Sequence, residues 1–111
     1  MIRMNTLKHV DTHMGELISD LQKLIQQPSV SAKNEGIEEC AKLVKTLLKF
    51  SGLKSEILRL KKGVAPIVFA EIKSKKNPGK TLMFYNHYDV QPAEPFDLWD
   101  DPPFRGVRKG K

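Results

Sequence analysis

The chain has 111 residues, of which 40% are hydrophobic, and a formal net charge of +6. This length fits one small domain or part of a larger one. No apolar run approaches the roughly 20 residues that a transmembrane helix needs, and the first residues lack the apolar stretch of a secretory signal. Because Cys40 is the only cysteine, no internal disulfide can form. We therefore expect a cytoplasmic protein that is not bound to a membrane.

The excess of basic residues suggests one alternative function, a non-enzymatic module that binds RNA or an acidic partner. The lysines flank the predicted strands, and more basic residues occupy positions 105–111. No nucleic-acid motif accompanies them, and the aromatic residues do not alternate with the lysines. We therefore interpret these charges as solvated loops and do not expect nucleic acid to bind.

Two amphipathic helices are predicted in the first half of the chain, at about 5–27 and 34–51. Apolar residues recur there at spacings of three and four, which places them on one face of each helix. Pro28 ends the first helix, and Gly52 suits the end of the second. Cys40 lies on the apolar face of the second helix, which indicates a core residue rather than a nucleophile.

The pattern then becomes that of strands, at about 55–60, 65–72 and 81–88. The first two are close enough to pair as a hairpin. The third is almost wholly apolar, which is typical of a central strand covered on both faces. A proline-rich loop follows at 91–104. The predicted fold class is α/β, with two N-terminal helices packed on a mixed sheet of about three strands.

The third predicted strand ends in His87 and Asp89, which share a face because side chains alternate along a strand. A carboxylate that holds one imidazole nitrogen fixes the tautomer and makes the other nitrogen a better metal ligand. Spacing alone leaves two interpretations open. His87 could bind a metal, or it could be a structural hydrogen-bonding residue, since no further ligand follows nearby.

The segment 84–92, Phe-Tyr-Asn-His-Tyr-Asp-Val-Gln-Pro, followed by Trp99 and a Pro-Pro-Phe at 102–104, resembles the first metal-binding motif of the M-twenty metallopeptidases. That family includes aminoacylases, carboxypeptidase G, succinyl-diaminopimelate desuccinylase and carnosine-type dipeptidases, and this motif looks most like the dipeptidase branch. The order of predicted elements fits along nearly the whole chain. Asn86 replaces the usual glycine, at a position where unusual backbone angles or a close approach of the backbone would favour these two residues.

The resemblance implies a role for both polar residues of the motif. His87 would ligate one of two zinc ions, for which manganese or cobalt could substitute, and Asp89 would be the catalytic-site residue that orients it. The metal pair would activate water against a peptide or acyl-amino-acid bond, so the substrate of the intact enzyme would be a dipeptide or acyl-amino acid.

The family's bridging aspartate and its general-base glutamate come later in the chain, and the sequence stops at Lys111. We therefore expect residues 1–111 to be the N-terminal, incomplete part of an α/β/α zinc-exopeptidase catalytic domain. Such a part would be inactive alone, would bind zinc weakly or not at all, and could self-associate through an uncovered sheet.

Overall fold

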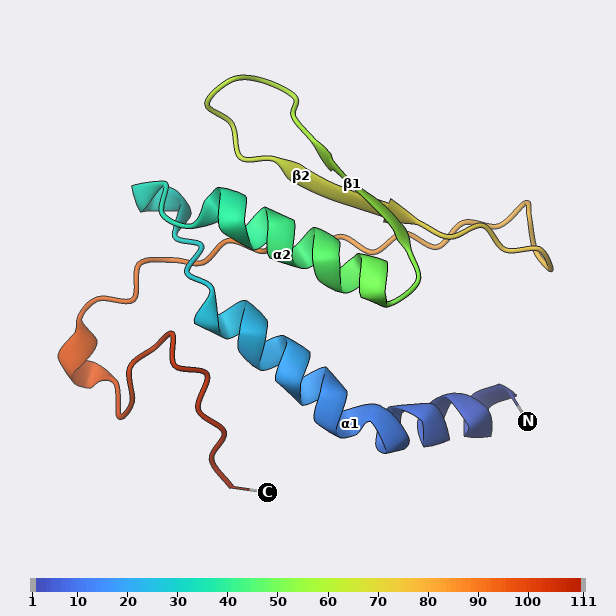
Figure 1. Cartoon of the computed structure of the whole chain (residues 1–111), viewed down its shortest axis with the longest axis horizontal. Helices are drawn as coiled ribbons and strands as arrows, with labels where there is room; N and C mark the ends of the chain where they lie inside the picture. Colours follow the sequence, from blue (N-terminus) through green and yellow to red (C-terminus); the bar gives the residue numbers. More distant parts are fainter. Residues whose placement is uncertain (1, 111) are drawn as a thin grey trace.

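The computed structural model describes residues 2–110, with side chains from Asn5 onward. It contains two α-helices, α1 (Ile2–Gln26) and α2 (Ile37–Phe50), and two strands, β1 (Lys54–Leu58) and β2 (Ile67–Glu71). Figure 1 shows α2 lying against the β1–β2 hairpin, with α1 beside α2 on the side away from the hairpin. The α/β class is confirmed. None of the helices in the described residues is long and apolar enough to span a bilayer.

A short connection joins α1 to α2 and fixes the angle between them. Pro28 follows the last turn of α1, where its ring and missing N–H prevent the helix from continuing. Gly36 then precedes α2 with a φ of 69°, and a Cβ there would lie 1.9 Å from the carbonyl oxygen of Pro28. Only glycine fits this close approach, so the connection is specified by residue type as well as by length.

The hairpin pairs its two strands antiparallel, with Lys54 opposite Glu71 and Leu58 opposite Ile67. Side chains alternate between exposed and half-buried along β2, as expected when one face of a sheet packs on a helix. A bidentate ion pair ties the end of the hairpin to α2, because Arg59 donates to both oxygens of Glu38 at 2.5 and 2.7 Å.

The core is small. Among residues 5–110, the buried apolar residues are Val30, Ile37, Cys40 and Ala41, and Ser29 is buried with them. They come from the α1–α2 connection and the first half of α2. The position of Cys40, 2% exposed, confirms that this residue belongs to the core. The core therefore lies directly behind the segment that carries His87.

The predicted third strand, residues 81–88, is wrong for the described chain. The segment is extended but unpaired, and its apolar side chains from Leu82 to Tyr85 are 80–82% exposed. Tyr88 reaches the backbone of Pro66 with its hydroxyl, so a whole side chain separates this segment from the start of β2. Paired strands lie only about 4.8 Å apart, and that spacing leaves no room for a tyrosine. An apolar pattern favours a strand, but it does not show whether a second strand is available to pair with it.

The chain after residue 90 forms the predicted irregular loop, with one 3-10 turn at Phe96–Leu98. It returns to α1, where the side-chain amides of Gln22 and Gln26 donate to the carbonyls of Gly106 and Arg105 at 2.8 and 3.1 Å. In Figure 1 this loop runs from the α1–α2 connection back along α1.

Candidate metal-binding site

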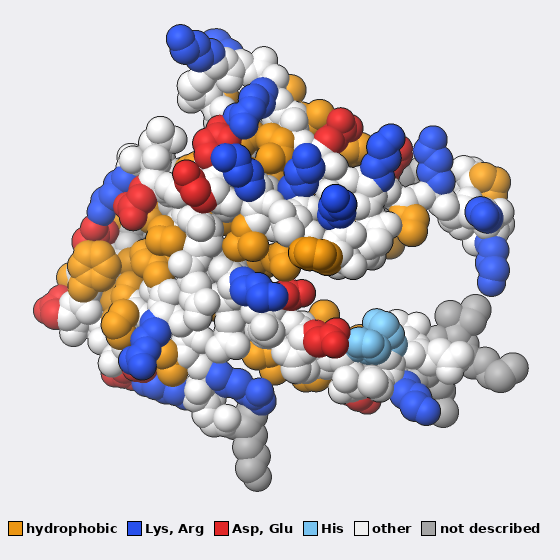
Figure 2. All heavy atoms as spheres, in the orientation of Figure 1, with side chains coloured by type: hydrophobic (Ala, Val, Ile, Leu, Met, Phe, Trp, Pro, Cys, Tyr) orange, Lys and Arg blue, Asp and Glu red, His pale blue; other side chains and the backbone are white. Residues whose placement is uncertain are grey.

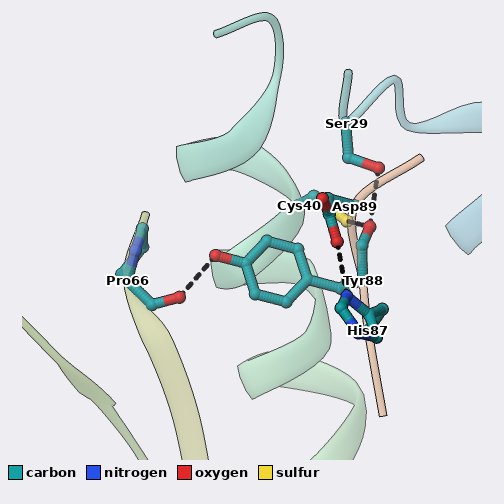
Figure 3. Close-up of polar contacts among 6 residues, drawn as sticks. All are labelled: Ser29, Cys40, Pro66, His87, Tyr88 and Asp89. Carbon is teal, nitrogen blue, oxygen red and sulfur yellow. Dashed lines mark hydrogen bonds and ion pairs between the residues drawn. The ribbon is translucent and has the colours of Figure 1, made fainter. Parts of the chain in front are cut away.

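The segment that carries His87 is held at its end by the α1–α2 connection (Figure 3). The Ser29 hydroxyl donates to the Tyr88 carbonyl at 2.7 Å, and the Val90 amide donates to the Ser29 carbonyl at 2.9 Å. Val30 forms a parallel bridge with Val90, and the Cys40 thiol lies 3.7 Å from the same Tyr88 carbonyl. Burial raises the pKa of the Cys40 thiol, so it remains protonated and can donate.

Tyr88 points inward from this segment. Its ring lies over α2 in Figure 3, and its hydroxyl donates to the Pro66 carbonyl at 2.5 Å. Burial is the main cause that raises the pKa of its phenol. Because side chains alternate along an extended chain, an inward Tyr88 turns its two neighbours, His87 and Asp89, to the opposite face.

His87 and Asp89 are in contact on that outer face. The imidazole Nδ1 lies 3.0 Å from Oδ1 of Asp89, and the two side chains are 72% and 37% exposed. The hydrogen bond with His87, followed by one with Ser31, lowers the pKa of Asp89. A carboxylate only accepts, so Nδ1 carries the hydrogen, and the lone pair of the neutral ring lies on Nε2.

This arrangement fits one position in a zinc coordination shell. The His87 ring is accessible, its Nε2 is free to bind, and its Nδ1 is oriented by a carboxylate, as in most metal-bound histidines. Within residues 5–110, however, no three His, Cys, Asp or Glu side chains converge on one point. Zinc normally takes three or four protein ligands. The described residues therefore offer one candidate ligand position and not a full shell.

Two features of the site were not apparent from the sequence. Ser29 and Tyr88 provide the anchor, yet their contact joins residues 59 positions apart, which no local pattern indicates. Asn86 needs no unusual backbone, since Asn34 is the only non-glycine residue with positive φ in the described part of the chain. The expectation of unusual angles at Asn86 is therefore wrong.

Comparison with known proteins identifies relatives of this chain. No family model matches the sequence. A succinyl-diaminopimelate desuccinylase from Blochmanniella pennsylvanica is 36% identical over 82% of this chain and 23% of its own length. A Cys-Gly metallodipeptidase from Saccharomyces cerevisiae is 28% identical over 96% of this chain and 26% of its own.

A solved structure gives a third match to this chain. The crystal structure of an M20 family metallo-carboxypeptidase from Sulfolobus solfataricus superposes with a TM-score of 0.70 and 41% identity over 80% of this chain. The chain is similar along most of its own length to M20 (M-twenty) metallopeptidases. It spans 20–26% of the length of these M20 relatives. The resemblance inferred from the motif at 84–92 is thus confirmed, and these relatives imply a metal cofactor.

Proposed function

We propose that this chain contributes a metal ligand and its orienting partner to an M20 amide hydrolase. The observation that carries the proposal is the 3.0 Å contact between Nδ1 of His87 and Asp89, within the motif that resembles the first metal-binding motif of the family. His87 would hold a zinc ion through Nε2, and Asp89 would fix the tautomer and rotation of the ring. When bound, a pair of such ions polarises a carbonyl and lowers the pKa of a water.

The substrate class belongs to the same proposal. Relatives named as a metallodipeptidase, a metallo-carboxypeptidase and a desuccinylase support a peptide or acyl-amino-acid bond as the target. We favour a dipeptide, in a reducing cytoplasm where the free Cys40 stays unpaired. Residues 1–111 alone should not hydrolyse it, because the described part offers no converging set of ligands.

Zinc titration by calorimetry tests the ligand assignment. The untagged chain is first changed by His9→Ala and His13→Ala, so that His87 is the remaining histidine. We expect weak zinc binding that His87→Ala removes and that Asp89→Ala weakens by about tenfold, since residues that orient a ligand typically matter to this extent. Asp97→Ala, a carboxylate on the neighbouring loop, is the matched control and should change nothing.

Two results would count against the proposal. Equal effects of Asp89→Ala and Asp97→Ala would show that Asp89 acts only through general negative charge. Hydrolysis of a Cys-Gly dipeptide by the zinc-loaded chain would show that these residues suffice for activity, contrary to the expectation that they do not.

The alternative of a basic binding module has one observation in its favour. Figure 2 shows a row of Lys and Arg side chains over α2 and the loop between β1 and β2. Acidic side chains interrupt this row in Figure 2. Glu38 on α2 also pairs with Arg59, which directly follows β1. A titration with single-stranded RNA at low salt decides between the two functions. RNA binding that falls steeply with added salt would favour the basic binding module. The absence of RNA binding would favour the hydrolase.

A further inference from the structure

Two histidines outside the His87 site lie together on α1. His9 and His13 are four residues apart, which places them on the same face of the helix one turn from each other. Their rings are stacked, with centroids 4.0 Å apart and planes inclined by 28°. Figure 2 shows these pale-blue side chains on the surface of α1, next to an acidic side chain. They are accessible, and the proposed peptidase site does not use them.

The hydrogen bonding of His13 sets which nitrogen is free. Its Nδ1 lies 2.8 Å from the carbonyl oxygen of His9. A carbonyl can only accept, so Nδ1 carries the hydrogen and the lone pair of the neutral ring lies on Nε2. A backbone carbonyl that fixes the ring in this way is a common partner of metal-binding histidines. His13 therefore has the tautomer that a metal needs before any metal arrives.

We infer that His9 and His13 chelate a divalent transition metal through their two Nε2 atoms. The helix holds both rings one turn apart, so the second ring binds with little additional loss of freedom once the first has bound. Imidazole suits Cu²⁺, Ni²⁺ and Zn²⁺, with Cu²⁺ expected to bind most tightly. Because no third His, Cys, Asp or Glu converges there among residues 5–110, water fills the remaining positions and binding is reversible.

The carboxylate of Glu16 adds a negative charge to this part of α1. Glu16 follows His13 by three residues, which places it on the same side of α1. Its charge lowers the energy of a cation nearby without completing the shell. This helix site has two imidazoles, whereas His87 has one. Metal added to the whole chain should therefore occupy α1 first.

Calorimetric titration of the untagged, metal-free chain with Ni²⁺ tests the inference. We expect about one ion to bind, with an affinity at least about tenfold lower in His9→Ala or His13→Ala and unchanged in His87→Ala. A spacing control combines Asp11→His with His13→Ala, which keeps two histidines but puts them on different faces of α1. This control should bind as weakly as the single variants.

A second measurement separates chelation from general loss of structure. Bridging one helical turn should raise the thermal midpoint of the wild-type helix signal at 222 nm when Ni²⁺ is added, and should not do so in the spacing control. The inference is overturned if the spacing control binds like the wild type, or if His87→Ala removes binding while the α1 variants retain it. Neither result depends on whether His87 serves a peptidase.

Discussion

Replacement of Ser29 by alanine should loosen the segment that carries His87. The Ser29 side chain is 3% exposed, and its hydroxyl donates to the Tyr88 carbonyl at 2.7 Å. After the change, that carbonyl keeps only the weaker Cys40 thiol at 3.7 Å. A lost buried hydrogen bond with a poorly satisfied acceptor costs about 1–2 kcal/mol. Since native proteins are stable by only about 5–15 kcal/mol, this loss is a large fraction of the free energy of unfolding.

Urea denaturation followed by circular dichroism measures the change. We expect the midpoint of Ser29→Ala to fall by about 1 M at an unchanged slope. Ser51→Ala is the matched control, since its hydroxyl donates to the Leu47 carbonyl at 3.1 Å on the exposed end of α2 and should matter by less than about 0.5 kcal/mol. Exchange of the Val90 amide hydrogen should also quicken about tenfold. Equal midpoints for the two variants, with Val90 still protected, would refute the role of Ser29 as an anchor.

Three further predictions follow from the same geometry. The pKa of Asp89 lies below its ordinary value of 3.8, so its contacts contribute stability that is present at neutral pH and lost as the pH falls below about 3.8. A carbon-detected NMR titration should show this pKa rising in His87→Ala, and no change would contradict the pairing. Burial raises the pKa of Cys40, so a disulfide reagent should label it slowly in the native chain and fast in urea, with equal rates speaking against burial. Self-association through the segment 81–88 should fall in light scattering with Phe84→Lys but not with Phe50→Lys, an equally exposed phenylalanine on α2, and equal effects would exclude this segment as the contact.

Much of the fold could be predicted because its signals are local. Helices α1 and α2 follow from apolar spacing and from Pro28 and Gly52, and the hairpin follows from two β-rich runs around a turn. The segment 81–88 failed for a physical reason. Its composition favours a strand, yet a strand forms only when a neighbouring strand pairs with it. The Tyr88 side chain lies between this segment and the start of β2, so the two cannot pair. Local pattern does not reveal whether that partner is present.

The candidate site divides in the same way. A period of two predicts that His87 and Asp89 share a face, and the structure places them 3.0 Å apart. The anchor could not be predicted, since Ser29 reaches Tyr88 across 59 positions and nothing in its neighbours marks it. The spacing of four residues between His9 and His13 can also be read from the sequence. Their ability to bind a metal depends on which nitrogen of His13 is free. Only the contact with the His9 carbonyl shows which nitrogen that is.

The anchor also bears on how a metal would be bound. Three contacts position Tyr88, from Ser29, Cys40 and Pro66, and all three partners precede it in the chain. They hold the backbone between His87 and Asp89 before any metal is present, so the ring does not have to lose its freedom at the moment of binding. Because of this preorganisation, Ser29→Ala should weaken zinc binding at His87 as well as stability, in the background that lacks the α1 histidines. A variant that loses stability elsewhere, such as Ser55→Ala, should lower stability without that loss of affinity, because the Ser55 hydroxyl donates to the Lys45 carbonyl and not to the anchor.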